Sequence, residues 1–168
     1  AIDSLSNIGP LEVLVGQFEI PLEVNEKVFE YARNNGVQTV LNPAPAGDVS
    51  EKLLNNTSWF IPNEIEFEEM LGEPFNENAL LKHSKETKPE IIVTLGEKGC
   101  AEVSDGKVYI HQAKKVTAID TTGAGDAFVG SFAYGLASKM SKQDSIQLAL
   151  EKATNSVTKK GTQSSYKD

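Results

Sequence analysis

Asp120-Thr-Thr-Gly-Ala-Gly-Asp-Ala-Phe-Val-Gly130 is the stretch around which the rest of the chain can be interpreted. An apolar run at residues 116–119 precedes it, and an amphipathic run at residues 128–136 follows it. This order predicts a strand, a glycine turn and the start of a helix. The first N–H groups of a helix have no internal partner, and the helix dipole favours negative charge there. The stretch therefore predicts a site for an anion such as a phosphate.

The residue types inside this stretch favour chemistry over a plain turn. Gly123 and Gly125 let the backbone approach a phosphate with no side chain in the way. Asp126 falls in the first helical turn, where a carboxylate is stabilised as the anion and could serve as a base. The alternative is an acidic first turn after an ordinary strand-to-helix loop. Two threonines, two glycines and two aspartates within residues 120–126 favour the functional interpretation.

The composition indicates one globular domain that does not bind nucleic acid. The chain has 168 residues, of which 39% are hydrophobic and 24% charged, enough for one domain with a core. Its net charge of −8 argues against nucleic acid or an anionic membrane surface as a partner. A phosphate ligand must therefore be held by local features, namely backbone amides, a metal ion and a few lysines.

Cysteine content and the start of the chain bear on location and completeness. A single cysteine, Cys100, excludes an internal disulfide and is in keeping with a reducing cytoplasm. No run approaches the ~18 apolar residues of a membrane span, and no signal-peptide pattern opens the chain. The first residue is Ala1 rather than Met, so we expect a piece of a longer protein or a processed product.

Alternating strand and helix patterns predict an α/β fold. Strands are expected at residues 13–18, 37–41, 59–61, 90–94 and 114–119. Helices are expected at about residues 21–34, 48–54, 64–71, 77–85, 124–138 and 141–158, the second of them capped by Asp48. Residues 100–103 and 107–110 flank Ser-Asp-Gly and predict a β-hairpin. The alternation indicates a Rossmann-like parallel sheet with flanking helices and right-handed crossovers.

Three turns are expected at the carboxyl ends of strands, where ligands of parallel sheets bind. They lie at Asn63, at residues 95–99 and at residues 121–125. Asn63 and Glu66 share one helix face and could stand near Mg²⁺, a hard ion that prefers oxygen ligands. They could equally be a helix cap and its capping-box partner. The glycines of residues 95–99 alone are a weak signal for a nucleotide-binding turn.

Two further observations limit the chemistry of the site. Asp120 precedes Asp126 by six residues, and two carboxylates so close would repel unless a cation lies nearby. Cys100, His83 and His111 are isolated in the sequence, with no spacing typical of metal ligands. Zinc or thiol chemistry is therefore not expected.

These motifs resemble those of the ribokinase (PfkB-type) family of sugar kinases. Asp120–Asp126 resembles the C-terminal signature of that family, and other motifs follow the family's order over nearly the whole chain: Gln17–Pro21, Asn42–Ala46, Asn63-x-x-Glu66, Thr94-Leu-Gly96 and Gly161–Ser165. The resemblance implies a ribokinase-like fold that binds ATP, Mg²⁺, K⁺ and a sugar substrate.

The resemblance also implies a role for each matched residue. Asp126 is the base, and the backbone amides of Gly123, Ala124 and Gly125 form the anion hole for the transferred phosphoryl group. The ATP site comprises Asn63, Glu66, Thr94, Gly96 and Gly99, with Glu66 in the vicinity of Mg²⁺. The K⁺ site comprises Asp120, Thr122, Gly161 and Ser165.

The chain departs from the family in length. Family members run to about twice this length, so residues 1–168 match the C-terminal, ATP-binding part of a single domain whose N-terminal part is missing. In the family the N-terminal part carries most of the sugar pocket and strands of the same sheet. We therefore expect the isolated chain to be nearly inactive. We also expect it to expose a sheet edge that self-associates or pairs with the missing part.

The expected function is ATP-dependent phosphorylation of a sugar, with D-ribose as the first choice because Asn42-Pro-Ala-Pro-Ala46 resembles ribokinase motifs most closely. A fructokinase-like kinase is one alternative. A nucleotide- or phosphate-binding module without catalysis is another, although such a module would not need the two aspartates. A dinucleotide-binding protein is not expected, since no Gly-x-Gly-x-x-Gly follows an early strand.

Overall fold

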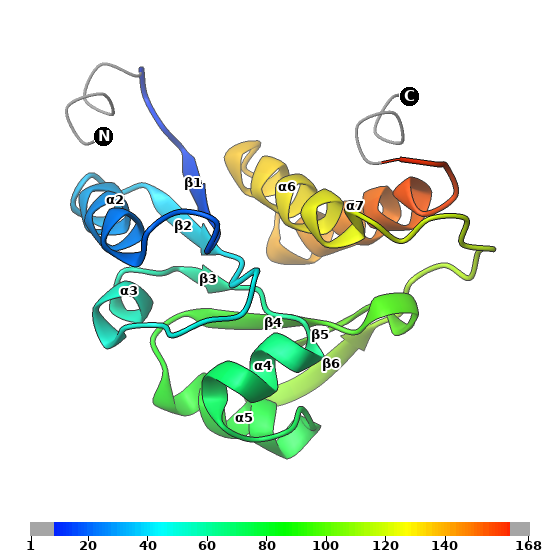
Figure 1. Cartoon of the computed structure of the whole chain (residues 1–168), viewed down its shortest axis with the longest axis horizontal. Helices are drawn as coiled ribbons and strands as arrows, with labels where there is room; N and C mark the ends of the chain where they lie inside the picture. Colours follow the sequence, from blue (N-terminus) through cyan, green and yellow to red (C-terminus); the bar gives the residue numbers. More distant parts are fainter. Residues whose placement is uncertain (1–8, 162–168) are drawn as a thin grey trace. The chain divides into compact units, whose positions relative to one another are not determined.

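Six strands form one sheet in the computed structural model of the chain, which describes residues 9–161. In order across the sheet they are β1 (Val13–Gly16), β2 (Gln38–Leu41), β3 (Trp59–Phe60), β4 (Glu90–Thr94), β5 (Cys100–Ser104) and β6 (Lys107–His111) (Figure 1). β1 to β4 pair in parallel, with Val13 opposite Gln38 and Trp59 opposite Glu90. The predicted α/β fold is confirmed.

The predicted hairpin is also present, as β5 and β6. Asp105 and Gly106 connect the two strands and have φ angles of 49° and 72°. Positive φ at both central residues is the combination of a type I′ turn, whose twist matches that of the flanking strands. The Ser-Asp-Gly sequence therefore predicted both the turn and the pairing.

The helices follow the predicted order. They are α2 (Leu22–Asn34), α3 (Glu51–Asn55), α4 (Glu64–Leu71), α5 (Glu77–Glu86), α6 (Ala124–Ala137) and α7 (Lys142–Ser156), with a 3-10 turn, η1, at Gly96–Lys98. The predicted cap of α3 is wrong. Ser50 rather than Asp48 is the N-cap, because the Ser50 hydroxyl accepts a hydrogen bond from the Leu53 amide (3.1 Å).

The strand predicted at residues 114–119 is absent, since the structure assigns no strand to that segment. Its apolar residues are not in the core: Val116 and Ile119 are 41% and 59% exposed. The amide of Ile119 donates to the carbonyl of Val157, just past α7, at 2.7 Å. The apolar run at residues 116–119 favoured a strand, but this segment is hydrogen-bonded to the end of a helix instead of to the sheet.

The chain divides into two compact units. Unit 1 comprises Ala1–Val93 and Ala101–Tyr109, and unit 2 comprises Thr94–Cys100 and Ile110–Asp168. In unit 1, α2 packs against β1, β2 and α3. In unit 2, α6 and α7 pack side by side (Figure 1).

Each unit has its own apolar core. The largest fully buried side chains of unit 1 are Phe29, Leu41, Leu53, Phe60, Ile61, Phe67, Leu80 and Ile92. Those of unit 2 come from the facing helices α6 and α7 and include Phe132 and Ile146, both 0% exposed. Trp59, Phe60 and Phe128 are buried as predicted.

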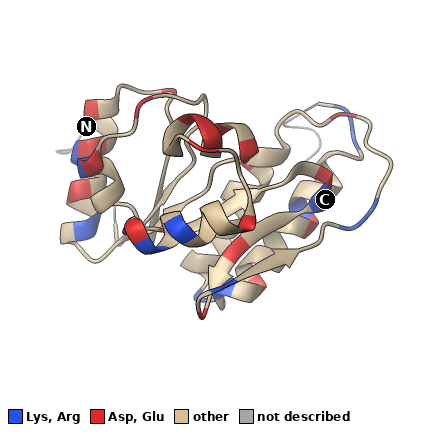
Figure 2. Ribbon diagram, turned by 90° about the horizontal axis from the view of Figure 1, so that it is seen from below, with Lys and Arg blue, Asp and Glu red and all other residues tan. Residues whose placement is uncertain are grey.

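The charges of the chain are distributed over its surface. Figure 2 shows Asp and Glu residues on many elements, in keeping with the net charge of −8. Within residues 9–161, none of the helices is both long and apolar enough to span a membrane.

Candidate functional site

The start of α6 carries the residues that the sequence singled out. Gly123 is the N-cap residue and has φ 80° and ψ 3°, a left-handed conformation that a residue with a side chain rarely adopts. No side chain caps this helix end. The carbonyl of Gly123 accepts the first helical hydrogen bond from Ala127 (2.9 Å). Asp126 lies exposed in the same first turn.

The backbone amides of residues 123–125 are not equivalent. The amide of Ala124 donates to the carbonyl of Thr121 at 3.3 Å and so closes the turn that enters the helix. The first N–H groups of a helix have no carbonyl partner within it, and the dipole adds positive charge there. With Asp126 in the first turn, the helix start therefore brings together N–H donors and one exposed carboxylate.

Asp120 holds the loop to the end of the chain. Its Oδ1 accepts from the amide of Thr122 (3.0 Å), and its Oδ2 accepts from the amide of Gly161 (3.1 Å). The backbone and side chain of Thr122, followed by the amide of Gly161, lower the pKa of Asp120 below its ordinary value. Three of the four residues predicted for a K⁺ site therefore lie together. The fourth, Ser165, lies outside the described residues.

The residues that position Asp120 come from the C-terminal end of α7. The carbonyl of Val157 accepts from the amide of Ile119 (2.7 Å) and from the amide of Asp120 (3.2 Å). Backbone contacts from beyond α7 thus fix the loop that leads into α6. Asp120 therefore connects the loop before α6 to the segment after α7, both of which belong to unit 2.

The turn after β4 is built around Gly99. Its φ is 107°, and a Cβ at this position would overlap the carbonyl oxygen of His111. The Leu95 amide donates to the carbonyl of Gly99 at 2.8 Å and closes the turn. A Cβ at Gly96 would meet nothing within 4 Å, but its φ of 57° is also left-handed. The backbone alone therefore explains why both positions are glycine. A contact with nucleotide stays a prediction for Thr94, Gly96 and Gly99.

Asn63 and Glu66 form a capping box at the start of α4. The Asn63 side chain accepts from the Glu66 amide, and the Glu66 side chain accepts from the Asn63 amide, both at 2.8 Å. Glu66 is 8% exposed, and burial raises the pKa of its carboxyl group. The structural alternative is thus confirmed. A metal role for the same pair stays a prediction. It is compatible with the burial of Glu66, because a nearby cation would favour the charged form of a desolvated carboxylate.

Two amide side chains without a predicted role lie where β1 and β2 end. Gln17 Nε2 donates to Asn42 Oδ1 (2.9 Å), and Asn42 Nδ2 donates to the carbonyl of Ile61, which follows β3 (2.9 Å). Asn42 is 8% exposed. The signal in the sequence was a polar amide residue directly after each of two apolar strands.

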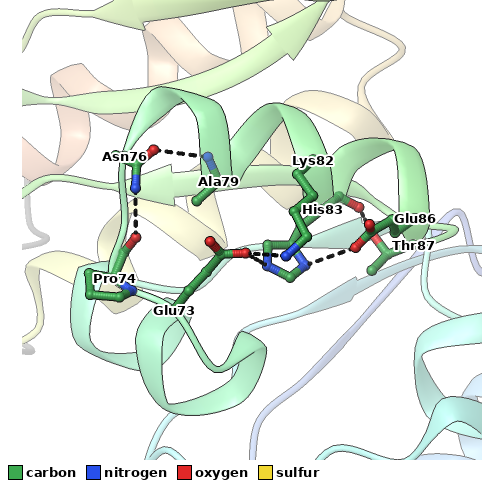
Figure 3. A network of polar contacts seen from close by, with 8 residues as sticks. All are labelled: Glu73, Pro74, Asn76, Ala79, Lys82, His83, Glu86 and Thr87. Carbon is green, nitrogen blue, oxygen red and sulfur yellow. Dashed lines mark hydrogen bonds and ion pairs between the residues drawn. The ribbon is translucent and has the colours of Figure 1, made fainter.

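His83, which lies far in the sequence from Cys100 and His111, contacts two glutamates in the structure. Its Nε2 lies 2.8 Å from Glu73 Oε1, and its Nδ1 lies 3.8 Å from Glu86 Oε2 (Figure 3). Lys82 Nζ contacts the same Glu73 oxygen at 2.6 Å, and this hydrogen bond lowers the pKa of Glu73. The network ties the loop before α5 to that helix. No group of three or more His, Cys, Asp or Glu side chains within residues 9–161 is arranged to hold a metal ion.

Comparison with known protein sequences gives consistent matches. A model of the pfkB family of carbohydrate kinases matches residues 9–168. Ribokinase of Haemophilus influenzae is 39% identical over 168 residues, 96% of this chain and 55% of that protein. Deoxyribokinase of Salmonella typhi is 35% identical over 162 residues, 92% of this chain and 53% of that protein. The chain thus spans about half the length of the curated relatives it matches.

Solved structures give the same result for the fold. A structure of Arabidopsis thaliana ribokinase complexed with ribose and ATP matches with a TM-score of 0.85 and 28% identity, over 93% of this chain and 53% of that chain. Ribokinase of Thermotoga maritima matches with a TM-score of 0.80 and 32% identity, over 92% of this chain and 52% of that chain. The likeness predicted from the motifs and the predicted fold class are confirmed.

Proposed function

The chain belongs to the pfkB family of carbohydrate kinases, and on that premise we propose that it serves the ATP-dependent phosphorylation of a sugar, D-ribose in the first place. The start of α6 is the observation that carries the proposal. There a left-handed Gly123 opens the helix without a side-chain capping hydrogen bond, and Asp126 lies in the first turn. Amide donors for a phosphoryl group and a base for a hydroxyl group are thereby held within one helical turn.

In the proposed reaction Asp126 accepts the proton of the primary hydroxyl group of the sugar. The hydroxyl oxygen attacks the γ-phosphorus of ATP, the bond from that phosphorus to the β–γ bridging oxygen breaks, and ADP leaves. The amides of Gly123, Ala124 and Gly125 donate to the phosphoryl oxygens as charge develops on them, and the Ala124 amide gives up its 3.3 Å hydrogen bond to the Thr121 carbonyl to do so. Such a transfer requires mainly positioning and charge stabilisation, so a carboxylate is a sufficient base.

Magnesium would be held in the vicinity of Glu66, with Asn63 beside it. A single desolvated carboxylate fits an ion that keeps several waters and binds mainly through phosphates. When bound, the ion neutralises charge on the phosphates of ATP. In the turn after β4, Thr94, Gly96 and Gly99 would contact the nucleotide.

Potassium would be held by Asp120, Thr122 and Gly161, together with Ser165. Both carboxylate oxygens of Asp120 accept backbone N–H groups, yet each oxygen has a second lone pair. The lowered pKa keeps Asp120 ionised and so suited to a cation. The ion would supply positive charge beside the loop that enters α6.

The sugar pocket would come in large part from a polypeptide that precedes this chain, and we propose that β1 pairs with it or with a second copy. β1 is at one end of the strand order, and Val15 on it is 45% exposed. The relatives that the chain matches are about twice as long. The kinase would act in the cytoplasm, in keeping with its one free cysteine, Cys100.

The function is tested by nucleotide binding and by turnover. Calorimetry should detect binding of magnesium-bound ATP to this chain. Formation of ADP that depends on ribose should require a longer protein that also contains the sugar pocket. Turnover of ribose by the 168-residue chain alone would contradict the proposal that the sugar pocket lies mostly outside this chain. Ribose, 2-deoxyribose and fructose should be compared, because the similar proteins include enzymes named ribokinase and deoxyribokinase. ATP binding with no turnover of any sugar by the longer protein would favour a non-catalytic module.

A further inference from the structure

Amide side chains form a chain of hydrogen bonds along the carboxyl ends of β1, β2 and β3. We propose that Asn42 is a positioning residue: its hydrogen bond to the carbonyl of Ile61 sets the position of the Asn63–Glu66 capping box, which begins two residues further on. The inference rests on the proposed function, since that function assigns Asn63 and Glu66 to the magnesium–nucleotide site.

The chain of hydrogen bonds joins α2 to the ends of three strands. Asn25 Nδ2 donates to the carbonyl of Gln17 (2.7 Å), and Gln17 Nε2 donates to Asn42 Oδ1 (2.9 Å). Asn42 Nδ2 then donates to the carbonyl of Ile61 (2.9 Å). All of these residues belong to unit 1.

The orientation of each amide group is determined by the backbone. Because a carbonyl only accepts, Asn42 must present its NH₂ group to Ile61 and therefore its oxygen to Gln17. Gln17 must in turn present its NH₂ group to that oxygen. Turning Gln17 over would oppose its oxygen to Asn42 Oδ1, and turning Asn42 over would break the link to Ile61.

Ile61 is held from both sides and passes its position on to α4. Its amide donates to the carbonyl of Leu41 (2.8 Å), its carbonyl accepts from Asn42, and its side chain is 1% exposed. Pro62 follows, with a ring that restricts φ. Asn63 comes next, in an extended conformation with ψ 179°, and its side chain caps the helix. A shift of the Ile61 carbonyl therefore reaches the capping box through one stiff residue.

A purely structural role for Asn42 makes a different prediction. A buried polar side chain must be hydrogen-bonded, and removing its partner destabilises the fold generally. A positioning role predicts a local effect at the capping box that exceeds the effect at other helix caps. The cap of α5 is the matched reference, because Asn76 Oδ1 accepts from the amide of Ala79 at 3.0 Å.

The test uses variants that break single links. Asn42→Asp keeps the acceptor for Gln17 but opposes a carboxylate to the Ile61 carbonyl. Gln17→Glu should act through Asn42 even though Gln17 does not touch α4; it is the second variant if Asn42→Asp does not fold. Asn56→Asp is the control, because Asn56 is a partly exposed amide side chain away from α4 that donates to the Lys52 carbonyl (3.0 Å).

Hydrogen exchange of backbone amides gives the main result. We expect the Glu66 amide to exchange about tenfold faster in Asn42→Asp and in Gln17→Glu, with little change at Ala79. Asn56→Asp should change neither amide. Equal acceleration at Glu66 and Ala79, or none at Glu66, would overturn the positioning role.

Nucleotide affinity connects the inference to the function. Asn42→Asp should weaken binding of magnesium-bound ATP about tenfold and leave binding of ATP in EDTA unchanged, because only the former uses the Asn63–Glu66 site. Equal weakening of both would count against the inference. If the unaltered chain bound no magnesium-bound ATP, the proposed function would fall, while the exchange experiment would still decide the role of Asn42.

Discussion

Asp120 Oδ2 accepts a hydrogen bond from the backbone amide of Gly161, 41 positions further along the chain, at 3.1 Å. One carboxylate thus joins the loop before α6 to the segment after α7. Its other oxygen accepts from Thr122 inside the loop. The arrangement makes Asp120 a structural link as well as a candidate ligand for a cation.

Replacing Asp120 by Ala should therefore loosen the segment at Gly161. We expect the amides of Thr122 and Gly161 to exchange about three- to fivefold faster. The amide of Asp144, capped by the Ser141 hydroxyl at 3.1 Å, should be unaffected and serves as the internal reference.

The hydrogen bond from Gly161 to Asp120 depends on an ionised carboxylate whose pKa is lowered. It should therefore persist through pH 5–7 and fail only as pH falls through that lowered pKa. Unchanged exchange at Gly161 would contradict the link.

Asp126→Asn tests the proposed base. In the longer protein that turns over sugar, kcat should fall by on the order of 10²–10⁴, because the amide cannot accept the hydroxyl proton. Asp144→Asn is the matched control, since Asp144 occupies the same position of α7, three residues after the N-cap, as Asp126 does in α6. Steady-state kinetics with saturating sugar measure the effect. A kcat that Asp126→Asn leaves unchanged would refute the assignment.

Glu66→Gln tests the cost of burying the carboxylate. Burial raises the folded-state pKa of Glu66 above its ordinary value of 4.5, so ionised Glu66 costs free energy in the folded state. Gln keeps the acceptor for the Asn63 amide without the charge. Without nucleotide, Glu66→Gln should raise Tm at pH 7 by about 2–4 °C. The gain in Tm should vanish below pH 4.5, where Glu66 is protonated in both the folded and the unfolded chain. A gain in Tm that does not depend on pH would contradict burial of the charged carboxylate as its cause.

Gly135→Ala tests the packing of α6 on α7. A Cβ at Gly135 would lie 2.6 Å from Ser145 Oγ and 2.8 Å from Ser145 Cβ, so the two helices would have to separate. We expect a loss of about 1–3 kcal/mol in the free energy of unfolding. Gly130→Ala in the same helix meets nothing within 4 Å and should stabilise the chain by about 0.5–1 kcal/mol. Urea denaturation of the two variants measures both changes in the free energy of unfolding. A Gly135→Ala protein as stable as the parent would refute the close contact between the two helices.

Local patterns predicted most of the fold. The start of α4 at Glu64 and the whole of β4 are as expected, because Pro62-Asn63 and a continuous β-branched run carry local signals of a cap and a strand. The predicted strand at residues 114–119 is wrong. Its apolar run is a local signal, but the Ile119 amide donates to Val157, a distant residue that no local pattern can identify.

For the candidate site as well, some features follow from local sequence and others only from tertiary contacts. The sequence by itself determined the family, because the Asp120–Asp126 motif and the motifs that accompany it match the family over residues 9–168. Only the tertiary structure decided the partners of Asp120, the capping box of Glu66 and the link from Gln17 through Asn42 to Ile61. The physical reason is that a hydrogen bond depends on where two groups meet in space, and that follows from packing of the whole chain.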